Sequence, residues 1–151
     1  MAIGELCSRE VIVIYRKDSV ADAARLMREH HVGSVVVVEP GDGRRPVGIF
    51  TDRDVTVGVV ALGLDAEKTL VEAVMRPGLA CLRETDGVGR AVALMRDQGV
   101  RRLPVVDASG RLVGLLAADD LLDVLAGEMS DLAVMASRGM TREARERAAV
   151  P

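Results

Sequence analysis

The chain has 151 residues, of which 49% are hydrophobic and 28% charged, and Tyr15 and Phe50 are its aromatic residues. This composition predicts a folded protein with an aliphatic core. A net charge of −3 and the scarcity of aromatic rings argue against nucleic-acid binding. No apolar run is long enough to span a membrane, the first residues do not resemble a secretion signal, and two cysteines are too few for a disulfide scaffold. We therefore expect a cytoplasmic protein.

One helical pattern occurs twice along the chain. Apolar residues recur with i, i+3, i+4, i+7 spacing in two places, and each member of the second set lies 68 positions (88 − 20) after its partner. This spacing predicts two amphipathic helices. Ser19, with Asp22 three residues later, predicts an N-cap for the first helix. The two sets are Val20, Ala23, Ala24 and Met27, and Val88, Ala91, Val92 and Met95.

The segments around these helices also match. Each helix is followed by a predicted strand, a turn containing glycine (40–46 and 108–111), a returning strand and a second helix. Each is preceded by a short helical segment and a short strand, and Thr69 with Glu72 suggests a capping box before the second of these segments. We predict an α/β (α+β) fold of two pseudo-symmetric β-α-β-β-α repeats at 1–67 and 68–127, with a helical tail at 128–151. The predicted strands are 11–14, 34–39, 47–50, 79–82, 102–107 and 112–116, and the predicted helical segments are 3–7, 52–62, 70–75 and 119–126.

Two regions fall outside the duplicated pattern. The predicted helix at 54–64 is apolar nearly all round, which in so small a chain favours covering by a second copy and hence a homodimer. The tail from 130 to 151 is rich in alanine and arginine. Its basic residues are expected to form a solvated face rather than a binding patch. They are Arg138, Arg142, Arg145 and Arg147.

Two motifs resemble a CBS-domain pair, also called a Bateman module. The first is the run at 47–54, which ends in Thr51-Asp52-Arg53-Asp54, and the second is the run at 100–107, Val-Arg-Arg-Leu-Pro-Val-Val-Asp. With Gly-Leu-Asp at 63–65, the chain is similar to small stand-alone bacterial CBS-pair proteins, and the resemblance covers 3–126. It implies a regulatory module that senses energy state through an adenosine nucleotide such as AMP, ADP or ATP. It implies neither catalysis nor a required cofactor, and it leaves the regulated partner protein unidentified.

The resemblance also implies two crossed ligand sites of unequal quality. In the first, Asp54 would accept hydrogen bonds from ribose hydroxyls with support from Thr51. The stretch Gly78-Leu79-Ala80 would supply an aliphatic slot for the base, and Arg101, Arg102 and Pro104 would lie at the phosphates. Arg53 is an alternative phosphate contact, ranked after Arg102 and Arg101. The second would combine Asp120 with Val11, Ile12, Gly33 and Ser34. It has Ala117 in place of the hydroxyl and no matching arginines, so we expect weak binding there or none.

Simpler interpretations of these residues remain open. Thr51 and Asp54 also suit an ordinary helix cap, and Arg101 and Arg102 could pair with Asp97 or Glu84. The two cysteines, Cys7 and Cys81, are expected in the core and not in a metal site. The chain shows no nucleophile–base pair and no phosphate-binding glycine loop followed by lysine. The alternative function is a ligand-free structural or protein-interaction module.

Overall fold

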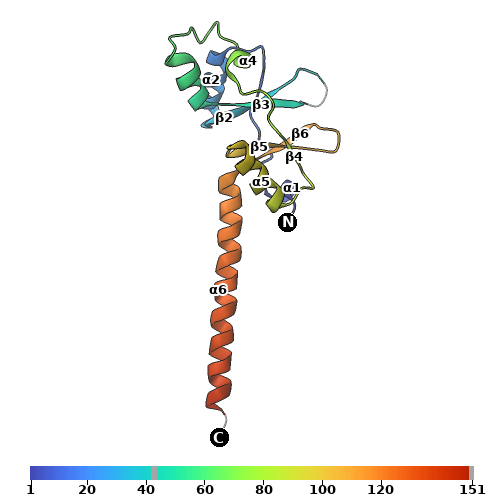
Figure 1. The fold of residues 1–151 in the computed structure, drawn as a ribbon, viewed down its shortest axis with the longest axis vertical. Coiled ribbons are helices and arrows are strands. Elements are labelled where there is room, and N and C mark those ends of the chain that lie inside the picture. The colour runs from blue at the N-terminus through green and yellow to red at the C-terminus, as the bar shows by residue number, and fades with distance from the viewer. Residues whose placement is uncertain (42–43, 150–151) are drawn as a thin grey trace. The chain divides into compact units, whose positions relative to one another are not determined.

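The computed structural model describes residues 1–41 and 44–149 (Figure 1). The chain divides into two compact units, one from Met1 to Ala117 and one that begins at Ala118. The centre of the predicted turn at 40–46 and the end of the predicted tail, residues 150–151, lie outside the described residues. The elements are α1 (Ile3–Leu6), β1 (Val13–Tyr15), α2 (Val20–His30), β2 (Ser34–Val38), β3 (Pro46–Thr51), α3 (Asp52–Val55), the π-helix η1 (Thr56–Val60), α4 (Val71–Val74), β4 (Leu82–Arg83), α5 (Val88–Gln98), β5 (Arg102–Val106), β6 (Leu112–Ala117) and α6 (Ala118–Ala148).

The first unit contains two three-stranded sheets of identical topology, with strand orders β1-β2-β3 and β4-β5-β6. In each sheet the first pair of strands is parallel and the second pair is an antiparallel hairpin. The register of both hairpins shifts at matching points, between Val37 and Val38 and between Val105 and Val106, which are 68 residues apart (105 − 37). The predicted duplicated α+β fold is confirmed.

The helices α2 and α5 begin and end at matching positions. The hydroxyl of Ser19 accepts the backbone N–H of Asp22 at 3.0 Å, so the predicted cap of α2 is confirmed. Both helices end at a residue with positive φ, His31 at 53° and Gly99 at 63°, which closes the last turn. The apolar faces are buried at Val20, Ala23 and Met27 of α2 and at Ala91 and Met95 of α5. Ala24 and Val88 are half-buried, and Val92 is 45% exposed.

The short helices α1 and α4 cross between the repeats. The first, α1, contacts β4 and β6 of the second sheet, whereas Val71 and Met75, at α4, belong to the buried cluster around Phe50 of the first sheet. The predicted capping box at α4 is absent, because the hydroxyl of Thr69 donates to the carbonyl of Asp65 instead. The crossing joins the two repeats into one unit, since neither sheet has its full core without a segment from the other repeat.

Strand β4 is shorter than the predicted strand at 79–82, and Pro104 supplies the physical reason. In the first sheet Val36 donates its backbone N–H to the carbonyl of Ile12 at 2.9 Å. Pro104 occupies the matching position of β5 and has no N–H to donate. The pairing of β4 with β5 therefore starts one residue later, at Leu82 and Val105, and the chain before it stays irregular.

The second helices of the repeats also differ from expectation. The helix predicted at 52–62 begins as α3 and widens into η1, where Ala61 donates to the carbonyl of Thr56 at 2.9 Å. The helix predicted at 119–126 and the predicted tail form one continuous helix, α6, so the expected boundary at 127/128 lies inside it. In the part of the chain that the structure describes, no helix combines the length and hydropathy needed to cross a bilayer.

Candidate functional site

A cavity of about 300 Å³ opens beside the end of β3 in the first unit. Its walls come from the β3–α3 junction of the first repeat and from the irregular segment before β4 and the α5–β5 junction of the second repeat. Six of the residues that the sequence assigns to the first site line it, namely Thr51, Arg53, Asp54, Leu79, Arg101 and Arg102. The structure therefore brings together the two motifs that carry the family resemblance.

Thr51 and Asp54 form a reciprocal capping box at the start of α3. The hydroxyl of Thr51 accepts the backbone N–H of Asp54 at 3.2 Å. Both the backbone N–H and the hydroxyl of Thr51 donate to Oδ2 of Asp54 at 2.9 Å. The other carboxylate oxygen, Oδ1, accepts no hydrogen bond from any residue in 1–41 or 44–149. Capping thus fixes the side chain of Asp54 and uses one of its two oxygens.

Four arginines surround the same cavity: Arg53, Arg76, Arg101 and Arg102. The carboxylates proposed as alternative partners for Arg101 and Arg102 are engaged elsewhere, since Asp97 pairs with Arg96 at 3.0 Å and Glu84 with Arg9 at 3.8 Å. Within the described ranges, Arg53, Arg76 and Arg102 form no ion pair. Guanidinium groups grouped in this way around a cavity suit an anionic ligand.

The remaining predicted residues of the first site lie close by but are not among the lining residues. Pro104 is buried in β5, and Gly78 lies in the irregular segment with a φ of 75°. The backbone N–H of Ala80 donates to the side chain of Gln98 at 3.4 Å. The contribution of these three residues to the first site stays a prediction.

Five lining residues were not predicted from the sequence: Ile49, Asp52, Arg76, Gly99 and Val100. Asp52 is adjacent to a predicted residue, and Gly99 and Val100 directly precede the predicted arginines, so their positions in the motifs could have indicated them. Arg76 is different. It follows α4 in a segment with no periodic pattern, and only the crossing of α4 onto the first repeat brings it to the cavity.

The residues of the second predicted site are divided between the two units. Val11, Ile12, Gly33 and Ser34 lie in the first unit, and Asp120 lies in α6. Gly33 contacts the first site instead. Its carbonyl accepts the backbone N–H of Asp52 at 3.0 Å, and a Cβ at this glycine would lie 3.2 Å from Oδ2 of Asp52. The second site stays a prediction.

Cys7 is buried and Cys81 is half-buried, and burial raises the pKa of the Cys81 thiol above its ordinary value. Among the described residues, no group of three or more histidine, cysteine, aspartate or glutamate side chains is placed to hold a metal ion. The candidate site is therefore the cavity, with its carboxylate, its guanidinium groups and its apolar wall.

Comparisons with known proteins identify relatives of this arrangement. The family model of the CBS domain matches residues 3–60 and 71–127. An uncharacterized protein of Methanopyrus kandleri is 37% identical over 124 residues, which cover 82% of this chain and 62% of that protein. The CBS domain-containing protein YhcV of Bacillus subtilis is 33% identical over 120 residues, covering 80% of this chain and 82% of that protein.

The fold also matches a solved structure with a ligand. A CBS domain protein of Pyrobaculum aerophilum, complexed with AMP, superposes with a TM-score of 0.73 at 26% sequence identity. The match covers 80% of this chain and 90% of that one.

Proposed function

This chain belongs to the CBS domain family as a pair of CBS repeats, and we propose from that premise that it is a regulatory module that binds an adenosine nucleotide. AMP, ADP and ATP are the proposed ligands, and the cavity beside β3 is the proposed site. The AMP-bound structure of a relative with the same fold supports the class of ligand. We propose that the protein acts in the cytoplasm and reports energy state to a regulated protein, with no catalytic step of its own.

The observation that carries the proposal is the state of Asp54 at the cavity wall. Thr51 holds the carboxylate through Oδ2, and Oδ1 has no partner in the described part of the chain. A carboxylate held in this way accepts hydrogen bonds from a vicinal diol such as that of ribose. The apolar side chains of Ile49, Leu79 and Val100 provide the wall for a purine.

The charges around the cavity favour a phosphorylated nucleoside. Four arginines and the two carboxylates of Asp52 and Asp54 line it, which leaves a formal excess of two positive charges (4 − 2). AMP, ADP and ATP supply increasing negative charge to Arg53, Arg76 and Arg102, whereas a nucleoside without phosphate supplies none. Arg102 is half-buried at the start of β5 and is the proposed principal phosphate contact.

Signal transmission is proposed to run through a homodimer. Four apolar side chains at and after η1 are exposed: Val57, Val60, Leu62 and Leu64. Exposed apolar side chains clustered on one short segment mark an interaction surface, and a second copy is the simplest partner. Asp54 lies in α3, which leads directly into η1, so a ligand that shifts α3 would also shift this surface.

Thermal unfolding in the presence of AMP, ADP, ATP, NAD or S-adenosylmethionine tests the proposal. A ligand at about 100 times its dissociation constant stabilises the folded state by about 2.7 kcal/mol. For a chain of this size we expect the midpoint to rise by roughly 5–11 °C, at about 2–4 °C per kcal/mol. The expected result is a rise with at least one of the adenosine phosphates.

The Asp54→Ala variant assigns the binding to the cavity. It also removes a carboxylate that holds the capping residue of α3, so it needs a matched control, and Asp22→Ala provides one. Asp22 bonds Ser19, the capping residue of α2, through the same pair of hydroxyl contacts, with a hydroxyl-to-Oδ2 distance of 2.9 Å, and it does not line the cavity. We expect both variants to unfold earlier without ligand and only Asp54→Ala to lose the nucleotide shift. A full shift in Asp54→Ala would refute the ribose assignment.

The ligand-free interaction module remains the second candidate function. Two features favour this candidate. Ala117 stands where the second ligand site would need a hydroxyl, and the apolar surface at η1 is exposed. This candidate predicts self-association with no thermal shift for any of the five ligands. A shift with any adenosine phosphate would exclude it.

A further inference from the structure

Helix α6 carries a continuous apolar line along most of its length. Its members are spaced alternately three and four residues apart, the pattern that brings one face of a helix against another helix. Its four large members are all exposed, from 41% at Leu125 to 71% at Met129. We call these residues the α6 seam: Leu122, Leu125, Met129, Leu132, Ala136 and Gly139.

The size of the seam residues changes along the helix. Leucine and methionine occupy the first four positions, and alanine and glycine occupy the last two. A Cβ placed on Gly139 would have no atom within 4 Å, so there is open space at the small end. Two copies packed side by side in the same direction would leave a gap there, which close packing disfavours.

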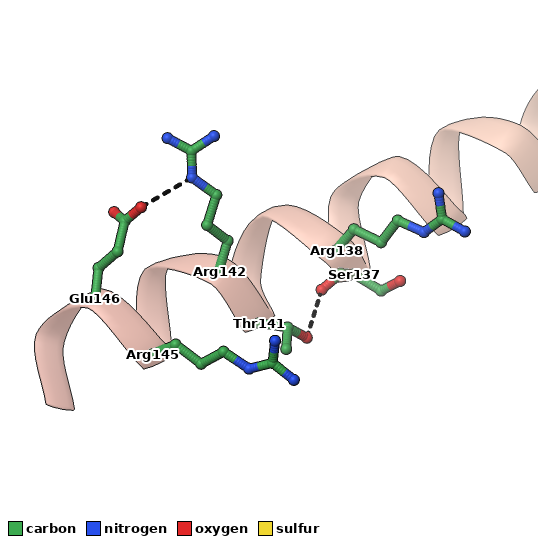
Figure 2. Close-up of a pocket in the computed structure, with 6 residues that line it drawn as sticks. All are labelled: Ser137, Arg138, Thr141, Arg142, Arg145 and Glu146. Carbon is green, nitrogen blue, oxygen red and sulfur yellow. Dashed lines mark hydrogen bonds and ion pairs between the residues drawn. The ribbon is translucent and has the colours of Figure 1, made fainter. Parts of the chain in front are cut away.

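The charges of α6 are also unequally divided. Residues 118–132 contain five acidic side chains and no basic one, whereas residues 133–148 contain four arginines and two glutamates. In the basic half, Arg142 pairs with Glu146 at 2.9 Å and Arg147 with Glu143 at 3.8 Å. Figure 2 shows Arg138 and Arg145 extending away from the Arg142–Glu146 pair, and within the described residues neither has an acidic partner.

We infer that α6 is an interface with the α6 of a second copy and that the two helices run antiparallel. Antiparallel pairing about the middle of the seam places Leu122 on the partner's Gly139, Leu125 on the partner's Ala136 and Met129 on the partner's Leu132. Large residues then face small ones, and the acidic half of each helix faces the basic half of the other. The opposed helix dipoles also favour the antiparallel arrangement. This inference does not depend on nucleotide binding.

Disulfide trapping in the full-length chain tests both the interface and its direction. The native cysteines are first replaced, as Cys7→Ala and Cys81→Ala, and Leu122→Cys or Gly139→Cys is then added to separate preparations. The two proteins are mixed in equal amounts in a glutathione redox buffer, and the linked species are separated by mass. Random pairing would make the mixed species half of the linked product. We expect a larger share, with the mixed species several times as abundant as either self-linked species.

Matched variants then assign the linkage to the seam. Leu125→Glu with Leu132→Glu is expected to abolish the excess of mixed species, whereas Val134→Glu, on the opposite side of the same helix and also exposed, is expected to preserve it. Glutamate is a good helix former, so far-UV circular dichroism should show an intact helix in both. Raising the salt to about 0.5 M should lower the mixed yield, because screening weakens attraction between opposite charges.

Three results would overturn the inference. Preferential self-linking of Leu122→Cys would show parallel helices, and random proportions would show chance collision. An excess of mixed species that survives the two seam glutamates would show that another surface brings the copies together.

Discussion

Replacing Gly114 by alanine is expected to destabilise the protein although it adds a single methyl group. A Cβ at this position would lie 2.4 Å from Sγ of Cys7, 2.9 Å from the carbonyl oxygen of Ser8 and 3.2 Å from Cβ of Cys7, where ordinary contacts begin at 3.4 Å. The Cys7 side chain can rotate, but the Ser8 backbone cannot easily withdraw, because it exchanges two hydrogen bonds of 3.0 Å with Leu115 of β6. The added methyl group therefore overlaps with a backbone carbonyl that two hydrogen bonds hold in place.

The magnitude follows from this overlap. Overpacking of a tight site lowers the free energy of unfolding by about 1–3 kcal/mol. The contact with the Ser8 backbone places Gly114→Ala in the upper half of this range, at about 2–3 kcal/mol. For a chain of this length the midpoint of thermal unfolding should fall by roughly 4–12 °C. Differential scanning calorimetry measures it. Adding Cys7→Ala should recover part of the loss, because it removes the shortest of the three contacts.

Two glycines serve as controls for the same substitution. Gly48 is the matching position of the first repeat, where a Cβ would meet Met75 and the Arg76 carbonyl at 3.3 Å, so Gly48→Ala should cost less than about 1 kcal/mol. Gly89 lies in α5 with open space around it, and Gly89→Ala should stabilise by about 0.5–1 kcal/mol. A Gly114→Ala midpoint equal to that of the wild type, or a Gly48→Ala loss of the same size, would refute this steric argument.

Three further predictions test other parts of the structure. Backbone N–H groups of Arg111 and Ser109, and the Arg111 side chain, hold the pKa of Asp107 below its usual range. The stabilising contribution of Asp107 is therefore present above the ordinary carboxyl pKa and is lost as the pH falls through the lowered value. The urea midpoints of wild type and Asp107→Asn should differ at pH 7 and converge below about pH 4. Burial raises the pKa of the half-buried Cys81. In a Cys7→Ala background its reaction with Ellman's reagent at about pH 8 should therefore be at least about tenfold slower than in urea, and equal rates would contradict the partial burial. Arg76→Ala should weaken adenosine-phosphate binding at least about tenfold in calorimetric titration, because a hydrogen bond to a charged group contributes about 1.5–3 kcal/mol. Unchanged affinity would remove Arg76 from the phosphate region.

The repeat architecture could be predicted because it rests on local patterns that occur twice. Apolar positions in the two amphipathic helices, glycine turns and apolar strands each have a short-range signal. The repeat offset, 68 residues before the turns and 66 after them (114 − 48), supports each by the other. The cap at Ser19 and the capping box of Thr51 and Asp54 are equally local. The six lining residues found in advance were implied by the resemblance to a CBS-domain pair, whereas local spacing alone favoured a helix cap at Thr51 and Asp54.

The features that were missed depend on contacts between distant segments. Nothing in the sequence near Ile3 or Val71 shows which sheet the short helix will cover, and the crossing is what brings Arg76 to the cavity. The late start of β4 had a signal, Pro104, whose effect appears only when β5 is known to be the central strand. The change to a π-helix at η1 accompanies a close approach, since a Cβ at Gly58 would lie 2.5 Å from Val74.

The crossed short helices also set an order of events during synthesis on the ribosome. The first sheet is complete once Thr51 has been made, yet its core waits for Val71 and Met75, about twenty residues later. The wait is longer at the other end. Cys7 is made about 110 residues before Ala117 (117 − 7), where β6, the strand that Ser8 pairs with, ends. The segment around α1 is therefore made long before the strand that covers it, and it stays accessible to chaperones and proteases while the rest of the first unit is translated.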